Sequence, residues 1–341
     1  MLRRFAMLAL ALAACISSIA CQRPSWHFSV VARVPVDLVD KYQGTVDTEF
    51  FVRQQLSTIN NRYQSSGAFR GDIVFDLAAF EVISDTPEHA VERSHPGYDF
   101  ALVYQETEHP AGGWRGDHQA ILHSWCTEAA KANCTGNTFG VFSSTPTQGL
   151  VHEFGHSRGG VDLYALEVQA AKNPFTHTAW SAPVSVMNNP FGVTTWDPYS
   201  VSIVDRSAGT VYSGAPVVNA AFPSSITVKV LSRGDVPVND VKIDVFPVPW
   251  FSGEVKGTAV LSGSSSSGNN TWTMSSNPFK PGASGKPWNL AYPNFLVRAR
   301  GGFGNVYVGY AWLPLTDVGN HAFATGNGPF TLTIYAAPTG F

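Results

Sequence analysis

The chain has 341 residues, of which 44% are hydrophobic, 12% are aromatic and only 14% are charged, with a formal net charge of −3. This length predicts two domains, and the hydrophobic content is sufficient for packed cores. The low charge and the lack of a basic run give nucleic-acid binding no electrostatic support. No apolar stretch after the N-terminus is long enough to span a membrane. The composition favours a β-rich, loop-rich extracellular protein.

The first 21 residues have the composition of an export signal. Met1–Arg4 is short and basic, and an apolar run extends from Phe5 to Ala14. Three endings remain open: a bacterial lipobox at Cys15, a weaker lipobox at Cys21, or plain cleavage near Ala20. Either lipobox would anchor the protein to a membrane by a lipid. We therefore expect an exported bacterial protein that is secreted, periplasmic or a lipoprotein of the outer membrane or cell surface.

Periodicity and alternation predict the elements that follow in chain order. A helix at about 47–64 is predicted from one apolar stripe: Val52, Leu56, Ile59 and Tyr63. Strands are predicted at 28–38, 72–83, 99–105, 119–125 and 138–142. Cys126 and Cys134 lie between the last two strands. In an exported chain they predict a small disulfide-closed loop, with two reduced thiols as the alternative.

The next helix has a readable start and end. Thr145 can cap it, Pro146 suits its first position, and Gln148 follows three residues after the cap. Gly159 and Gly160 should end it, because glycine adopts a positive φ at little cost. A further helix is predicted from Asp-Pro at 197–198 to about residue 208.

The helix that starts at Thr145 contains the motif H-E-x-x-H, formed by His152, Glu153 and His156. Residues four apart share one helix face, so both imidazoles can bind one metal ion. Glu153 can reach a metal-bound water as a general base without binding the metal. Catalytic zinc needs a third protein ligand, and the two glycines after the helix allow Asp162 to return with its carboxylate.

The run H-E-x-x-H-x-x-G-x-x-D, from His152 to Asp162, resembles the metzincin zinc signature with Asp in place of the commoner His. Snapalysin-like bacterial proteases are similar in using Asp there. The amino-acid sequence around the two histidines also resembles that of IgA-peptidase-like proteins, which usually have one more residue before the Asp. The resemblance covers about residues 28–210. It implies a catalytic domain with a mixed, twisted sheet and an active-site helix.

The resemblance also implies a methionine turn beneath the metal, and Met187 fits its position. Asn189 stands where some metzincins carry a tyrosine that stabilises the oxyanion, which leaves Tyr164 and Tyr199 as candidates. Substrate is expected to bind along residues 119–125, by resemblance to the antiparallel edge strand of the family. Residues 188–193 are expected to form one wall of the pocket.

From residue 226 onward, short alternating segments are separated by Gly, Pro and Asn. They predict an all-β, immunoglobulin-like sandwich over residues 216–341. A Ser/Gly/Asn tract at 262–270 is expected to form a mobile loop. The predicted organisation is therefore an export signal at 1–21, a metzincin-like domain at 22–215 and this sandwich.

We expect an α+β protein that acts as an exported zinc metalloendopeptidase on a protein or peptide substrate. One zinc ion would be bound by His152, His156 and Asp162, with Glu153 as the general base. The alternative is a non-proteolytic binding or adhesion protein of the cell surface on a metzincin-like scaffold. The presence of Glu153 favours the enzyme.

Overall fold

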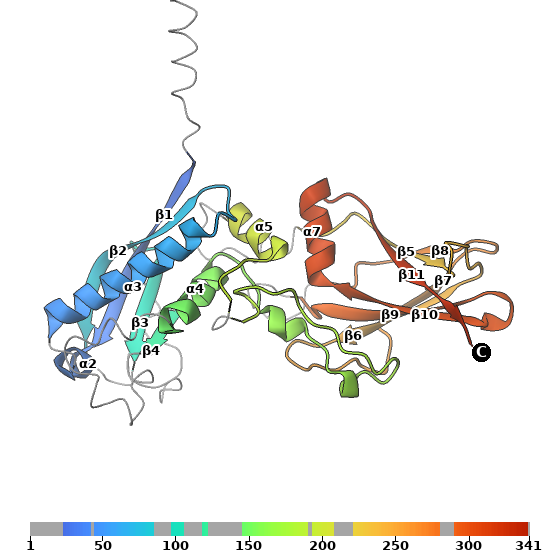
Figure 1. Cartoon of the computed structure of the whole chain (residues 1–341), viewed down its shortest axis with the longest axis horizontal. Coiled ribbons are helices and arrows are strands. Elements are labelled where there is room, and N and C mark those ends of the chain that lie inside the picture. Colours follow the sequence, from blue (N-terminus) through green and yellow to red (C-terminus); the bar gives the residue numbers. More distant parts are fainter. Residues whose placement is uncertain are drawn as a thin grey trace, which may run out of the picture.

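The structure is a computed structural model, which describes residues 23–41, 44–84, 97–105, 118–121, 145–189, 193–207, 221–279 and 290–339. Figure 1 shows two lobes, one formed by a sheet with helices and the other formed by two sheets. The expected α+β class is confirmed. The export signal, the Cys126–Cys134 pair, the strand at 138–142 and the boundary at 215 all lie outside the described residues.

The N-terminal lobe contains a four-stranded sheet in the order β2-β1-β3-β4. Its strands are β1 (Ser25–Pro35), β2 (Asp72–Ile83), β3 (Phe100–Gln105) and β4 (His118–Ile121). All three pairings are parallel. The expectations of a mixed sheet and of an antiparallel edge strand are therefore wrong for the described strands. A parallel pair needs a crossover connection, and α3 (Thr45–Ser65) lies between β1 and β2 in the chain.

The first strand is as long as predicted but lies three residues nearer the N-terminus, at Ser25–Pro35 in place of 28–38. It ends at Pro35, and α2 (Val36–Lys41) follows where the strand was expected to continue to residue 38. Proline lacks the N–H that would continue the hydrogen-bond ladder of a central strand, so the strand ends there.

The core of this lobe lies between the sheet and two helices, α3 and α4 (Thr145–Ser157). The four stripe residues of α3 are all buried, as predicted: Val52, Leu56, Ile59 and Tyr63. The Tyr63 hydroxyl donates to the carbonyl oxygen of Val151 at 3.0 Å, which ties α3 to α4. Phe154 of α4 packs edge-on against Phe75 of β2, with the ring centroids 4.4 Å apart. These contacts fix the helix that carries both motif histidines.

The C-terminal lobe has a five-stranded sheet, β12-β10-β9-β6-β7, and a three-stranded sheet, β11-β5-β8. Both sheets contribute to one apolar cluster, so they pack face to face. The strands are β5 (Ile226–Leu231), β6 (Lys242–Val248), β7 (Leu261–Ser264), β8 (Thr271–Thr273), β9 (Asn294–Gly301), β10 (Tyr307–Pro314), β11 (Phe330–Tyr335) and β12 (Ala337–Pro338).

A helix corrects the all-β expectation, and one of the strand pairings is parallel. Helix α7 (Leu315–Thr325) connects β10 to β11, and β11 pairs with β5 in parallel. The tract at 262–270 also is not one loop, because its first residues belong to β7 and pair with β6. Gly263 of β7 leaves room for the Trp272 ring of β8, because a Cβ atom at position 263 would overlap that ring.

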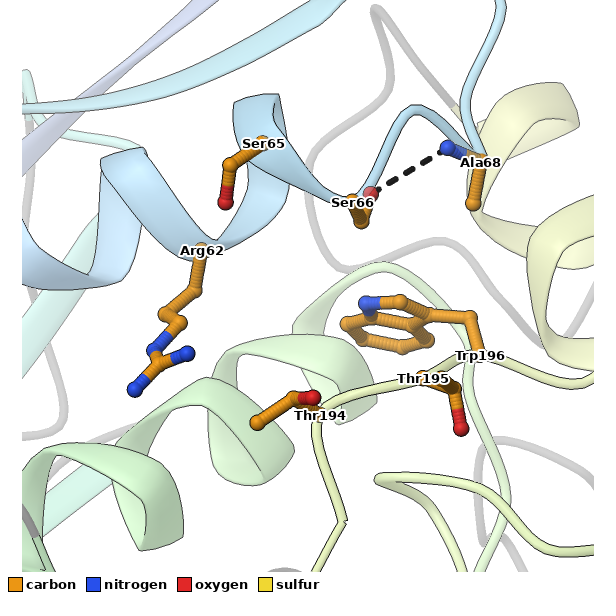
Figure 2. A pocket seen from close by; sticks show the side chains of 7 residues that line it. All are labelled: Arg62, Ser65, Ser66, Ala68, Thr194, Thr195 and Trp196. Atoms are coloured by element: carbon orange, nitrogen blue, oxygen red, sulfur yellow. Dashed lines mark hydrogen bonds between the residues drawn. The ribbon is translucent and has the colours of Figure 1, made fainter.

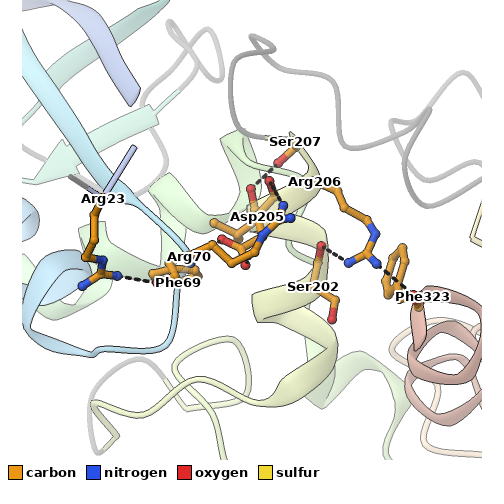
Figure 3. A network of polar contacts seen from close by, with 9 residues as sticks. Arg23, Phe69, Arg70, Ser202, Asp205, Arg206, Ser207 and Phe323 are labelled. Atoms are coloured by element: carbon orange, nitrogen blue, oxygen red, sulfur yellow. Dashed lines mark hydrogen bonds and ion pairs between the residues drawn. The ribbon is translucent and has the colours of Figure 1, made fainter. Parts of the chain in front are cut away.

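Helix α5 (Pro198–Ser207) joins the two lobes (Figure 3). Arg70 in the N-terminal lobe donates from Nε to Asp205 Oδ2 at 3.1 Å and from its backbone N–H to Oδ1 at 3.0 Å. The Arg206 guanidinium donates to the Phe323 carbonyl of α7 at 2.9 Å and lies over the Phe323 ring. Among the described residues, no helix combines the length and apolarity needed to cross a membrane.

The apolar core of the C-terminal lobe extends into the segment that follows α4. Leu163 and Leu166, in a short 3-10 helix (η4, Leu163–Leu166), belong to the same cluster as Phe295 and Leu313 of the sandwich. The Asn294 side-chain amide donates to the carbonyl oxygen of Leu166 at 3.1 Å. The segment that leaves the motif helix is therefore held by the sandwich.

Candidate metal centre

The chain reverses sharply after α4. Gly159 has a φ of 88°, and the N–H of Gly160 donates to the Gly155 carbonyl at 2.8 Å. A positive φ is the usual backbone of a residue that follows a helix, and glycine adopts it without a steric cost. This turn brings Asp162 back toward the two histidines of the helix.

Three side-chain atoms converge at this point. His152 Nε2 lies 3.0 Å from His156 Nε2, and Asp162 Oδ1 lies 3.1 Å from each of them. His152 is buried, with 3% of its surface exposed, while the other two are partly exposed. Within the described residues, this is the one cluster of His, Cys, Asp and Glu side chains that could hold a metal ion.

Backbone carbonyls orient both imidazoles. His152 Nδ1 lies 2.9 Å from the Val186 carbonyl, and His156 Nδ1 lies 2.9 Å from the Gly160 carbonyl. A carbonyl oxygen can only accept, so each Nδ1 carries a proton. Each Nε2 can therefore offer a lone pair toward the shared point. Such a bond from the second ring nitrogen is the usual support of a metal-binding histidine.

The three side chains of the cluster are electrostatically coupled. Burial acts to raise the pKa of Asp162, but its bonds to both histidines hold the pKa well below the ordinary value. Burial likewise acts to lower the pKa of His156, but the hydrogen bond and charge of Asp162 and the charge of Glu153 raise that pKa to about 9. A positive charge is therefore favoured at the shared point.

Met187 lies against Gly155 of α4 and Gly160 of the turn that follows the helix. It is fully buried, and a Cβ atom on Gly155 or Gly160 would lie 2.6 Å from Met187 Sδ or 2.9 Å from Met187 Cε, respectively. Its turn is closed by the N–H of Asn188, which donates to the Ser185 carbonyl at 3.0 Å. The Met187 carbonyl accepts from the N–H of Leu163 at 2.9 Å, which fixes the backbone beside Asp162.

The structure separates the two tyrosine candidates. Tyr164 is 43% exposed, and its ring stacks on His152 with the centroids 6.3 Å apart. Its pKa is raised by burial and then by the charge of Asp162, a hydrogen bond to Asp162 and the charge of Glu153. Tyr199 is buried in the junction against α7 and belongs to the sandwich cluster. Only Tyr164 lies at the centre.

Glu153 is partly buried on the same helix and does not belong to the three-atom cluster. Its negative charge acts on the pKa of both His156 and Tyr164, so it lies near the same point.

Parts of the expected substrate cleft lie outside the described residues, including 122–125 of the edge strand and 190–192 of the pocket wall. Phe251 is not among the site residues expected from the sequence, although the centroids of its ring and the Tyr164 ring are 5.8 Å apart. No sequence signal pointed to this contact, since 87 positions separate the two residues (251 − 164).

A separate cavity of about 350 Å³ opens between the end of α3 and residues 194–196 (Figure 2). Its lining is mostly polar and contains none of the three clustered residues: Arg62, Ser65, Ser66, Ala68, Thr194, Thr195 and Trp196. The cavity is therefore distinct from the candidate metal centre. No protein-family model matches this chain, and no curated protein sequence matches it either.

Proposed function

We propose that this protein is an exported, zinc-dependent metalloendopeptidase. The observation that carries the proposal is the convergence of two imidazole nitrogens and one carboxylate oxygen at 3.0–3.1 Å, on and beside the helix that carries Glu153. Zinc binds such atoms tetrahedrally at about 2.0–2.2 Å, which places neighbouring ligand atoms about 3.3–3.6 Å apart. The donor set therefore fits zinc, and the observed spacing falls short of the tetrahedral value by only a few tenths of an ångström.

The number of ligands supports a catalytic role. Structural zinc sites are closed by four protein ligands, whereas catalytic sites have three and keep one position open. In the part of the chain that the structure describes, no fourth His, Cys, Asp or Glu joins the group. A bound zinc ion would supply a Lewis acid and lower the pKa of a coordinated water toward neutrality.

The chain's own residues supply the proton transfers. Glu153 is the general base that takes a proton from the attacking water as the new C–O bond forms. It then delivers the proton to the leaving amine as the C–N bond breaks. The Nδ1 atoms of His152 and His156 are bonded to backbone carbonyls, and their Nε2 atoms would bind the metal, so neither histidine would compete for that proton.

Tyr164 is suited to stabilise the oxyanion that develops on the scissile carbonyl. Its raised pKa keeps the phenol protonated, and its hydroxyl lies beside the Asp162 carboxylate. A partly exposed O–H donor next to the reacting carbonyl would stabilise the transition state more than the ground state. This role replaces the tyrosine that would otherwise stand at Asn189.

Two variants of the full chain test the two parts of this proposal separately, the general base and the set of zinc ligands. Glu153→Gln should bind zinc as the wild type does and lose hydrolysis, because Glu153 handles protons and is not a ligand. Asp162→Ala should lose both, since two ligands rarely hold a catalytic zinc. We would measure zinc per chain after dialysis against a graded chelator. Cleavage of a denatured protein mixture, with and without chelator, gives the activity.

Each result has a distinct meaning. Wild-type turnover by Glu153→Gln would refute the mechanism, and equal zinc retention by Asp162→Ala would refute the ligand set. A wild-type protein that binds zinc tightly but cleaves nothing would favour the alternative, a non-proteolytic binding protein of the cell surface.

A further inference from the structure

A loop of the C-terminal sandwich reaches the candidate metal centre. Residues 249–253 follow β6, and their backbone is bonded to the segment that leaves α4. The N–H of Phe251 donates to the Ala165 carbonyl at 3.0 Å, and the N–H of Gln169 donates to the Gly253 carbonyl at 3.0 Å. Lys172 Nζ adds a bond to the Ser252 carbonyl at 3.2 Å. The loop is thus fixed beside the centre.

This loop extends a row of rings outward from the centre. Tyr164 stacks on His152 with an interplanar angle of 21°, and Phe251 packs on Tyr164 at 59° with the centroids 5.8 Å apart. Phe251 is 59% exposed and Tyr164 is 43% exposed. A solvent-accessible aromatic surface therefore begins at one of the candidate metal ligands and ends on the second lobe.

The backbone at Phe251 is unusual for an exposed aromatic residue. Its φ is 59°, in the left-handed region that Gly and Asn adopt easily and bulky residues adopt at a cost. The neighbouring Trp250 indole donates to the Leu290 carbonyl at 3.0 Å, which anchors the loop without help from the Phe251 ring. Because the Phe251 ring is more than half exposed, its burial contributes little stability to offset the cost of this backbone conformation.

We propose that Tyr164 and Phe251 form a subsite that accepts an aromatic or large apolar side chain of the peptide substrate. This inference rests on the peptidase function proposed above and names the substrate class that the centre prefers. An aromatic side chain packs well on the exposed face of another ring. The sandwich then completes the substrate-binding site, since Phe251 belongs to that lobe.

The test compares two hydroxamate probes on the zinc-loaded full chain. One is a dipeptide hydroxamate with a benzyl side chain, and the other carries a methyl group in its place. Calorimetry gives the two dissociation constants for the wild type and for Phe251→Asn. Asparagine suits the left-handed backbone, so this variant should keep its fold, as a thermal melt will show. Phe251→Gly is a second variant with the same property.

Phe303 provides a matched control. It is fully exposed on the β9–β10 connection of the same lobe, so Phe303→Asn removes an equivalent ring away from the centre. We expect the wild type and Phe303→Asn to prefer the benzyl probe by about tenfold, and Phe251→Asn to lose that preference.

A preference that persists in Phe251→Asn and Phe251→Gly, or that is absent from the wild type, overturns the inference. The outcome is separable from the fate of the proposed function. If the wild type cleaves no peptide but shows a Phe251-dependent preference, the peptidase function fails and the subsite stands.

Discussion

The contact between Gly155 and Met187 can be tested by adding one methyl group. Gly155 lies between the two motif histidines on α4, and it faces the fully buried Met187. In Gly155→Ala the new Cβ would lie 2.6 Å from Met187 Sδ and 3.3 Å from the Trp196 ring. Ordinary carbon contacts are about 3.5–4.0 Å, so the thioether has to move by about 1 Å.

Two opposing terms set the size of the effect. Overpacking of a tight core costs about 1–3 kcal/mol, and replacing Gly with Ala inside a helix returns about 1 kcal/mol. We expect Gly155→Ala to lower the free energy of unfolding by about 1 kcal/mol. Met187→Ala alone should cost about 2–5 kcal/mol, but it removes the sulfur. When Met187→Ala is already present, Gly155→Ala should stabilise the protein by about 1 kcal/mol, because only the higher helix propensity of alanine remains.

The assay is denaturant unfolding of the four proteins of this double-mutant cycle, in chelator and at one pH. The predicted coupling is about 2 kcal/mol, well above the limit of about 0.5 kcal/mol expected for independent sites. Zinc affinity is a second readout. The Val186 carbonyl that orients His152 belongs to the same turn as Met187. A shift of Met187 in Gly155→Ala should therefore disturb this hydrogen bond and lower the zinc affinity about 10–100-fold. An effect of equal sign and size in both backgrounds would refute the packing argument.

Two further predictions concern single side chains. Tyr164→Phe should lower kcat about a hundredfold while KM and zinc content stay unchanged, because only the oxyanion donor is lost. Steady-state kinetics with metal analysis checks this, and an unchanged kcat excludes the role. Burial acts to raise the pKa of Asp244, but hydrogen bonds from Arg298 and Ser262 and the charges of Arg298 and Arg300 outweigh it and lower the pKa. The contribution of Asp244 to stability is thus present above its unfolded pKa of about 3.9 and is lost as the pH falls through the folded value. Asp244→Asn should cost about 1–2 kcal/mol near pH 7 and progressively less below about pH 4 in unfolding titrations. A cost independent of pH contradicts this assignment.

The helices of the N-terminal lobe could be predicted because their signals are local. The apolar stripe of α3 and the capping residues of α4 lie within a few positions of one another, and both helices end within two residues of the expected positions. The glycine that ends α4 was predicted from its freedom at positive φ, and Gly159 adopts 88°.

Strand direction and connection could not be predicted in this way. Alternating side chains look the same in parallel and antiparallel strands, so the sequence did not distinguish the parallel sheet of the N-terminal lobe from a mixed one. Helix α7 was missed because residues 315–325 lie between two clear strands of a segment that otherwise alternates. Its position is set by packing on the junction, where Gly319 lies against the Tyr199 ring.

At the candidate centre, the sequence by itself determined that His152, Glu153 and His156 share one helix, because their spacing matches the helical repeat. The sequence also proposed Asp162, but only the tertiary structure placed its carboxylate 3.1 Å from both imidazoles. The tertiary structure also placed Tyr164, and not Tyr199, against His152, and it placed Phe251 of the other lobe against Tyr164. These outcomes depend on contacts between residues far apart in the chain. Such contacts are fixed by the packing of whole elements, which no local pattern encodes.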